Sequence, residues 1–301
     1  MITKNDVSAL IDEQVASEIF ADAQKQSKVL SMFRKLPNMT SDKTKLRVSD
    51  ALPVAYFVNE NKDNGRKNIT KSAWENVFLT AEEIAVIVPI KENLLNDASI
   101  DVWGEIKPQL VSAIAKTIDT AVFTGEGAPT SWGEGIIPTI VEKGKTTAET
   151  GNLYEDINKA MTQVEESGFE VNGLLGGVGL KGKFRMMTDK NGQPLNTTEI
   201  GSLRREYLDN GAWNKELATL IAGDFNQAVY AIRQDVDYKV LSEAVIQDPA
   251  DGKILYNLAQ EDMVALRVTF RMGYAIPNPV TFLDGTEARY PFSALVPSEG
   301  L

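Results

Sequence analysis

Few side chains in this sequence of 301 residues can carry out chemistry, because it contains neither histidine nor cysteine. Their absence removes the usual imidazole base, the thiolate nucleophile and most transition-metal sites. Carboxylates, lysine, tyrosine and serine are the remaining candidates for catalysis. We therefore predict a protein that is not an enzyme, with no catalytic residues, no cofactor and no bound metal.

One glycine motif could bind a cofactor. The stretch GVGLKG places Gly177, Gly179 and Gly182 in the spacing of a dinucleotide-binding turn. That fold also needs a β-strand on each side of a helix, and an acidic residue at the end of the second strand. Glu199 lies at a suitable distance along the chain, but in a polar loop. We expect a tight turn here rather than a cofactor site.

Adjacent carboxylates form the other candidate chemistry, at Glu82–Glu83 and Glu165–Glu166. Hydrolysis by paired carboxylates needs two groups that converge, usually from separate elements. Neighbouring residues on a strand point to opposite faces of the sheet, and neighbours on an exposed helix face are solvated. We expect both pairs to be solvated surface groups.

The stretch IDTAVFTGEGAPTSWGEGII, residues 118–137, is rich in glycine and proline. An apolar run stops at Gly125, which suits the left-handed residue that ends a helix. Gly127, Gly133 and Gly135 follow within ten residues. We interpret these four glycines as a structural turn. The apolar run after them, which contains Pro138, is predicted to be a strand.

Three helices are predicted from apolar residues at three- and four-residue spacing, over residues 5–33, 99–125 and 153–167. The second contains Pro108, so we expect a kink or a restart there. Gly168 is expected to end the third.

Two long strands are predicted at 45–60 and 68–90, on either side of a polar tip with the turn residues Asn64 and Gly65. A two-stranded hairpin is marginal alone in water, so it must contact something else. Apolar and polar residues alternate over 261–273, which predicts a half-buried antiparallel strand. The fold class is α+β.

Charge is unevenly distributed along the chain. Residues 1–75 carry 12 basic and 10 acidic side chains, whereas residues 76–301 carry 19 basic and 32 acidic ones. An acidic body repels DNA phosphates, so sequence-specific DNA binding is not expected. The sequence has no apolar run long enough to span a membrane and no secretory signal, so we expect no membrane partner.

Four blocks in a fixed order resemble the major capsid proteins of tailed bacteriophages, whose fold is shared with herpesvirus capsids and encapsulins. They are IDTAVFTGEG with the later GEGII, MTDKNGQPL (187–195), IAGDFNQAVYAIRQDVDYKVLSEA (221–244) and MVALRVTFRMGYAIPNPVTFL (263–283). Together with the preceding hairpin and helix, the resemblance covers almost the whole chain.

The resemblance implies the phage major-capsid fold. Residues 1–43 would form an N-terminal arm, 44–78 an extended E-loop, and 79–150 the first part of a P-domain with a long spine helix at 99–125. Residues 151–258 would form the A-domain, and 259–301 the closing strands of the P-domain. The four glycines would then turn the chain from the spine helix towards the A-domain.

The apolar positions of the predicted hairpin would be exposed to water on an isolated subunit, so we expect the hairpin to lie across an adjacent subunit and its residues to make intersubunit contacts. The apolar candidates are Val54, Tyr56, Val58 and Trp74. The basic candidates at the tip are Lys62, Arg66 and Lys67, which would meet an acidic neighbour.

The function implied is that of a structural late protein, which self-assembles as hexamers and pentamers into an icosahedral shell around double-stranded DNA. Assembly would take place in the host cytoplasm, and the product would be the virion capsid, with a portal and decoration proteins as partners. The predicted arm begins near Met1, which leaves no room for a leading scaffolding segment and implies a separate scaffolding protein. The alternatives are an encapsulin-like nanocompartment shell and an enzyme on an unrelated α+β fold.

Overall fold

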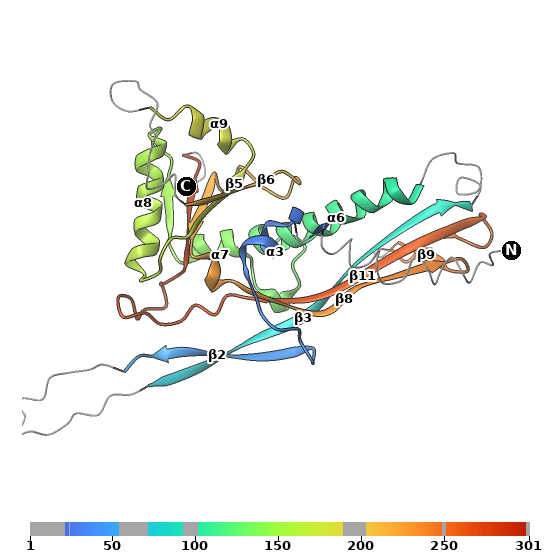
Figure 1. The fold of residues 1–301 in the computed structure, drawn as a ribbon, viewed down its shortest axis with the longest axis horizontal. Helices are drawn as coiled ribbons and strands as arrows, with labels where there is room; N and C mark the ends of the chain where they lie inside the picture. The colour runs from blue at the N-terminus through green and yellow to red at the C-terminus, as the bar shows by residue number, and fades with distance from the viewer. Residues whose placement is uncertain are drawn as a thin grey trace, which may run out of the picture.

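Two five-stranded sheets and one long helix organise the part of the protein that the structure describes (Figure 1). The computed structural model describes residues 22–23, 25–53, 72–92, 102–188, 203–248 and 251–298. Helices and strands both contribute substantially within these ranges, as expected for the α+β class.

The first sheet, called here the long sheet, has the strand order β1-β8-β11-β3-β2. All its pairings are antiparallel except that of β1 with β8. Strand β3 is long enough to pair with β11 over one half and with β2 over the other. The strands are β1 (Arg34–Lys35), β2 (Lys43–Ala51), β3 (Ala73–Lys91), β8 (Val229–Leu241) and β11 (Met263–Ala275).

Helix α6 (Val102–Thr124) lies along one face of the long sheet (Figure 1). Its buried residues Leu110, Ile114 and Ile118 belong to the same core cluster as Leu266 and Phe270 of β11. The helix continues through Pro108 without a break, so the restart considered from the sequence does not occur.

The second sheet, called here the compact sheet, has the order β4-β12-β7-β5-β6. Leu174 and Leu295 on one face pack with helix α8 (Leu153–Glu166), whereas Leu175 and Val296 on the other face join the core around α6. Both sheets therefore share one hydrophobic core. The strands are β4 (Thr146–Ala148), β5 (Gly173–Gly177), β6 (Arg204–Leu208), β7 (Leu220–Gly223) and β12 (Phe292–Val296).

Short elements connect these layers. Helix α8 (Leu153–Glu166) ends before Gly168, whose φ is 84°, as predicted. The remaining elements are α3 (Lys28–Met32), η1 (Thr130–Trp132), α7 (Ile136–Glu142), α9 (Leu180–Arg185), η2 (Phe225–Gln227), β9 (Val245–Gln247) and β10 (Ile254–Asn257).

The strand predicted around Pro138 is wrong, because residues 136–142 form helix α7. Pro138 lies in the first turn of this helix, where its missing N–H has no intrahelical partner to lose. The hydroxyl of Thr139 donates to the carbonyl of Gly135 at 2.6 Å and reinforces this turn.

The single helix predicted over residues 5–33 is interrupted within its described part. Ser27 is extended, with φ −73° and ψ 127°, and its hydroxyl caps α3 by accepting from the Leu30 N–H. Serine stabilises a helix N-terminus in this way better than it stabilises a helix interior.

Strand β11 is antiparallel as predicted, but more than half of it is buried. Ala265 on the expected polar face is fully buried, because it packs in a small cluster with Leu258 and Met263. Thr269 on that face is also buried.

The sheets divide the chain differently from the expected domain boundaries. Strand β8 lies within the range expected for the A-domain but pairs with β11 in the long sheet. Strand β12 lies in the range expected to close the P-domain but pairs with β7 in the compact sheet. The chain therefore crosses between the sheets twice after residue 223.

Candidate assembly surface

Strands β2 and β3 extend beyond the rest of the protein as a two-stranded ribbon (Figure 1). The pairing of β3 with β11 ends at Ala81, and from Thr80 to Ala73 strand β3 pairs with β2 alone. A ribbon of two strands exposes both faces unless something covers them. We call residues 43–51 and 73–80 the ribbon.

One face of the ribbon packs on the protein's own core. Leu79 is fully buried in a cluster with Met39 and Val229, and Leu46 and Val77 pack against this cluster. This face anchors the base of the ribbon.

The other face of the ribbon combines cations with exposed aromatic side chains. Lys43, Lys45 and Arg47 alternate along β2 and are all exposed. Across the register, Lys45 lies opposite Phe78 and Ser49 lies opposite Trp74. The side chains of Trp74 and Phe78 are 66% and 56% exposed. The remaining members of this face are Asn76 and Thr80, so its described residues include no carboxylate.

Trp74 is the one predicted contact residue within the described part of the chain. Val54, Tyr56, Val58, Lys62, Arg66 and Lys67 lie outside the described residues. Sequence reasoning missed Lys43, Lys45, Arg47 and Phe78, although a signal was present. Residues two apart on a strand share a face, so KTKLR already aligns its three cations.

The glycine-rich corner supports the base of the ribbon. Its four glycines, Gly125, Gly127, Gly133 and Gly135, all have positive φ, between 69° and 91°. The corner carries η1, whose Trp132 indole N–H donates to the carbonyl of Thr80 at 3.2 Å.

Backbones meet closely within this corner. A Cβ on Gly135 would lie 2.5 Å from the Gly125 nitrogen, and a Cβ on Gly125 would overlap the Glu134 carbonyl oxygen. The two ends of the corner therefore touch, and only glycine fits at both positions.

Two further contacts hold the ribbon, one where it leaves the long sheet and one further out. The Ser131 hydroxyl donates to the Glu82 carboxylate at 2.6 Å. Further out, where Ser49 pairs with Trp74, the Val280 N–H donates to the Ser49 carbonyl at 3.0 Å. The glycine-rich corner and the connection between β11 and β12 together fix the direction in which the ribbon projects.

Asp119 of α6 joins three separate segments. Its carboxylate accepts hydrogen bonds from the Ser27 hydroxyl at 2.7 Å, from the N–H groups of Lys28 and Val29, and from the Asn210 amide at 2.7 Å. Burial raises the pKa of Asp119, and the four hydrogen bonds oppose that effect. The contacts tie α3 and the loop after β6 to the long helix.

The glycine motif serves packing. Gly177 ends β5, and a Cβ there would lie 2.7 Å from the indole of Trp213, which fills the space above it. Gly179 has the ordinary helical φ of −59°. Strand β6 runs parallel to β5 after the motif, but the intervening α9 has only six residues. The fingerprint therefore lacks the open glycine turn that a pyrophosphate needs.

The acidic pairs do not converge. Glu82 and Glu83 lie on β3, where Glu83 pairs in register with Arg271, while Glu165 and Glu166 are exposed at the end of α8. Within the described ranges, no group of three acidic residues is placed to hold a metal ion. No helix among the described residues is long and apolar enough to cross a membrane.

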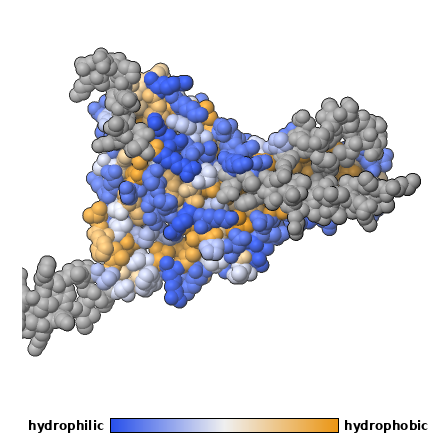
Figure 2. Space-filling view, viewed as in Figure 1, coloured by the Kyte–Doolittle hydropathy of each residue, from blue (hydrophilic) through white to orange (hydrophobic). Residues whose placement is uncertain are grey.

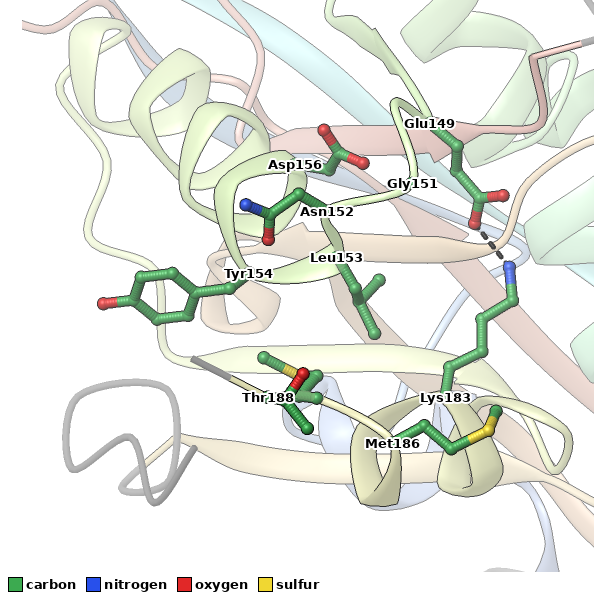
Figure 3. Close-up of a pocket in the computed structure, with 10 residues that line it drawn as sticks. Glu149, Gly151, Asn152, Leu153, Tyr154, Asp156, Lys183, Met186 and Thr188 are labelled. Carbon is green, nitrogen blue, oxygen red and sulfur yellow. Dashed lines mark hydrogen bonds and ion pairs between the residues drawn. The ribbon is translucent and has the colours of Figure 1, made fainter. Parts of the chain in front are cut away.

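A cavity of roughly 460 Å³ lies between the start of α8 and the end of α9 (Figure 3). Its charged groups are already engaged with partners. Lys183 pairs with Glu149 at 2.5 Å, and the buried Asp156 accepts from the backbone N–H and the hydroxyl of Thr150. The Tyr154 ring points away from these groups in Figure 3.

Comparison with known proteins identifies the class. The family model described as the phage capsid family matches residues 8–284. The curated "Major capsid protein" of Staphylococcus phage 80alpha is 25% identical over 281 residues, which cover 89% of this chain and 82% of that protein.

Solved structures agree. One from Microbacterium phage Oxtober96 has a TM-score of 0.78 and 31% identity, over 99% of both chains. Another, from Mycobacterium phage Adephagia, has a TM-score of 0.80 and 29% identity, over 99% of this chain and 98% of that one.

The chain belongs to the phage capsid family. Its function is structural: it forms the shell of the phage virion. The resemblance seen in the four sequence blocks is confirmed, and the encapsulin alternative is not favoured.

Proposed function

We propose that this protein is the major capsid protein of a tailed phage, and that its ribbon joins subunits within the shell. In pentamers and hexamers, the ribbon of each copy lies across the next copy, as an E-loop does. The exposed cation–aromatic face of the ribbon is the observation that carries this proposal.

Apolar burial supplies the first part of the argument. Phe and Trp side chains bury about 150–250 Å² each, and each Å² contributes roughly 25 cal/mol. Trp74 and Phe78 expose more than half of their surface in the single subunit. Covering both would therefore stabilise each contact by on the order of 5 kcal/mol.

Charge supplies the second part. Lys43, Lys45 and Arg47 project from a chain whose formal net charge is −11. A cationic patch is attracted to a second copy whose net charge is negative. Exposed ion pairs contribute about 1 kcal/mol or less each, so they set the register of the contact more than its strength.

Substitutions on opposite faces of the same strand test the proposal. Replacing Trp74→Ser together with Phe78→Ser should leave the free energy of unfolding within about 0.5 kcal/mol, because both side chains are solvated in the subunit. Shells should no longer form, which sedimentation and electron microscopy can measure.

Val77→Ser is the matched control, since Val77 faces the core from the same strand. It should lower the melting temperature, yet allow shells below that temperature. Normal shells from the Trp74/Phe78 variant would refute the ribbon contact.

The two sheets correspond, in this proposal, to the two domains of the capsid fold. The compact sheet with α8 and α9 is the A-domain near the axis of each ring. The long sheet with α6 is the P-domain. The support is that each sheet has its own layer of helices while sharing one core.

The shell would enclose double-stranded DNA without reading its sequence, after assembly in the host cytoplasm with scaffolding, portal and decoration proteins. The acidic excess of the chain supports enclosure of DNA without sequence reading, because negative charge on the shell wall repels the DNA phosphates. We expect no measurable binding of the subunit to duplex DNA at physiological salt. A submicromolar dissociation constant would contradict this expectation.

A further inference from the structure

The part of the protein built on the compact sheet carries opposite charges on two of its sides. Helix α8 lies along one side in Figure 1, and α9 with the edge strand β6 lies along another. We call these the α8 side and the α9 side.

The α9 side is cationic. Lys181, Arg185 and Arg205 are exposed there, and none of them pairs with a carboxylate among the described residues. Aromatic rings hold two of these cations in place. The Lys181 ammonium lies 4.9 Å from the centre of the Tyr207 ring, and the Arg205 guanidinium lies 5.4 Å from that of Phe184. Such contacts position a cation while leaving its charge available.

The α8 side is acidic. Four exposed carboxylates lie on α8 or just after it, against one exposed cation, Lys159; they are Glu155, Glu165, Glu166 and Glu170. The turn that carries Phe282 and Leu283 is attached beside the end of this helix, because the Thr281 hydroxyl donates to the Ser167 carbonyl at 2.7 Å.

Both sides also expose large apolar side chains. Phe282 and Leu283 are 78% and 75% exposed on the α8 side, and Met186 is 73% exposed on the α9 side. Figure 2 shows hydrophobic surface at the lower left, where Figure 1 places the connection between β11 and β12. Exposed apolar groups beside charges are typical of protein–protein contacts.

The apolar turn is built to keep its shape. Arg289 donates to the carbonyls of Asn278, Pro279 and Thr286 at 2.6–3.2 Å, which closes the loop from 278 to 289. Little conformational freedom is then left to lose when Phe282 and Leu283 are covered.

We propose that the α9 side of one subunit packs against the α8 side of a second copy. Two α8 sides would repel each other, as would two α9 sides, so the contact joins different surfaces. A contact of this heterologous type continues around a ring until the ring closes. This inference rests on the proposed assembly into rings and names a second contact within them, separate from the ribbon.

Charge reversal with rescue tests the contact. One variant carries Glu165→Lys and Glu166→Lys, another carries Lys181→Glu and Arg185→Glu, and a third carries all four substitutions. Each of the first two should reduce the yield of shells about tenfold or more, because like charges then face each other. The third variant should restore the yield of shells, because both sides are reversed and opposite charges again face each other across the contact.

A matched control makes the same change of net charge as the Glu165/Glu166 variant elsewhere, with Glu142→Lys and Glu243→Lys, both exposed in the wild type. It should assemble normally, and the melting temperatures of all variants should match the wild type. Shells from both single-sided variants, or no rescue in the third, would overturn the inference. Duplex DNA binding that is lost with Lys181→Glu and Arg185→Glu would overturn it too, by assigning the α9 side to nucleic acid.

The test separates this contact from the ribbon contact. If the charge variants assemble and the Trp74/Phe78 variant does not, the ribbon proposal stands and this inference fails. If the Trp74/Phe78 variant assembles while the two single-sided charge variants fail and the combined variant is rescued, this inference stands and the ribbon proposal fails.

Discussion

Asp119 shows how one buried side chain can hold together parts of the chain that are far apart in sequence. Its partners Ser27 and Asn210 lie 92 and 91 positions away. A buried carboxylate is stable in such a place only because each lone pair is met by a donor. At the residue scale, we infer that this junction sets where the arm meets the body.

We predict that Asp119→Ala lowers the free energy of unfolding by about 3 kcal/mol, because buried N–H donors lose their acceptor. Asp119→Asn should cost less, since its carbonyl oxygen retains part of the acceptor role. Urea unfolding measures both. Equal stability of the alanine variant and the wild type would show that the junction contributes nothing.

At the scale of elements, the corner from Gly125 to Gly135 ends the long helix and supports the ribbon. Gly135 and Gly127 both have positive φ, but only Gly135 is in close contact with another backbone segment. Gly135→Ala should therefore cost more stability than Gly127→Ala, for which we expect about 1 kcal/mol. Thermal unfolding of the two variants compares them directly. Similar losses in both would mean that the close approach of the backbones is unimportant.

Local patterns predicted the regular elements well. The apolar spacing of 153–167 and the alternation of 261–273 correspond to α8 and β11. Predictions failed where a local signal was ambiguous. Pro138 suggested a strand, yet proline is also suited to the first turn of a helix. Ser27 was read as part of a helix because its partner Asp119 is remote in sequence.

Contacts between distant segments explain most of what the sequence could not predict. The strand order that places β8 in the long sheet and β12 in the compact sheet depends on pairings across the whole chain. The sequence predicted only part of the exposed ribbon face. It pointed to Trp74 as a contact residue, but not to its neighbour Phe78 or to the cations on the opposite strand. Only the register between β2 and β3 brings them onto one face.

At the scale of the whole molecule, the protein is a body of two sheets with a ribbon that has one face packed on the body and the other face exposed. Single subunits leave Trp74 and Phe78 in water, which is consistent with a part that is complete only in a shell. The contact made by the ribbon is therefore the central claim, and removal of the outer part of the ribbon tests it most directly.

The decisive measurement is electron microscopy of the protein after residues 47–76, which include Arg47 and Trp74 of the ribbon, are replaced by a short Gly-Ser turn that joins the paired residues on either side. We predict a soluble subunit with a melting transition near that of the wild type, because the core clusters of the described residues lie outside this segment. We also predict that no closed shells form under conditions in which the wild type assembles. Normal shells from the shortened protein would contradict the claim that the ribbon joins neighbouring subunits.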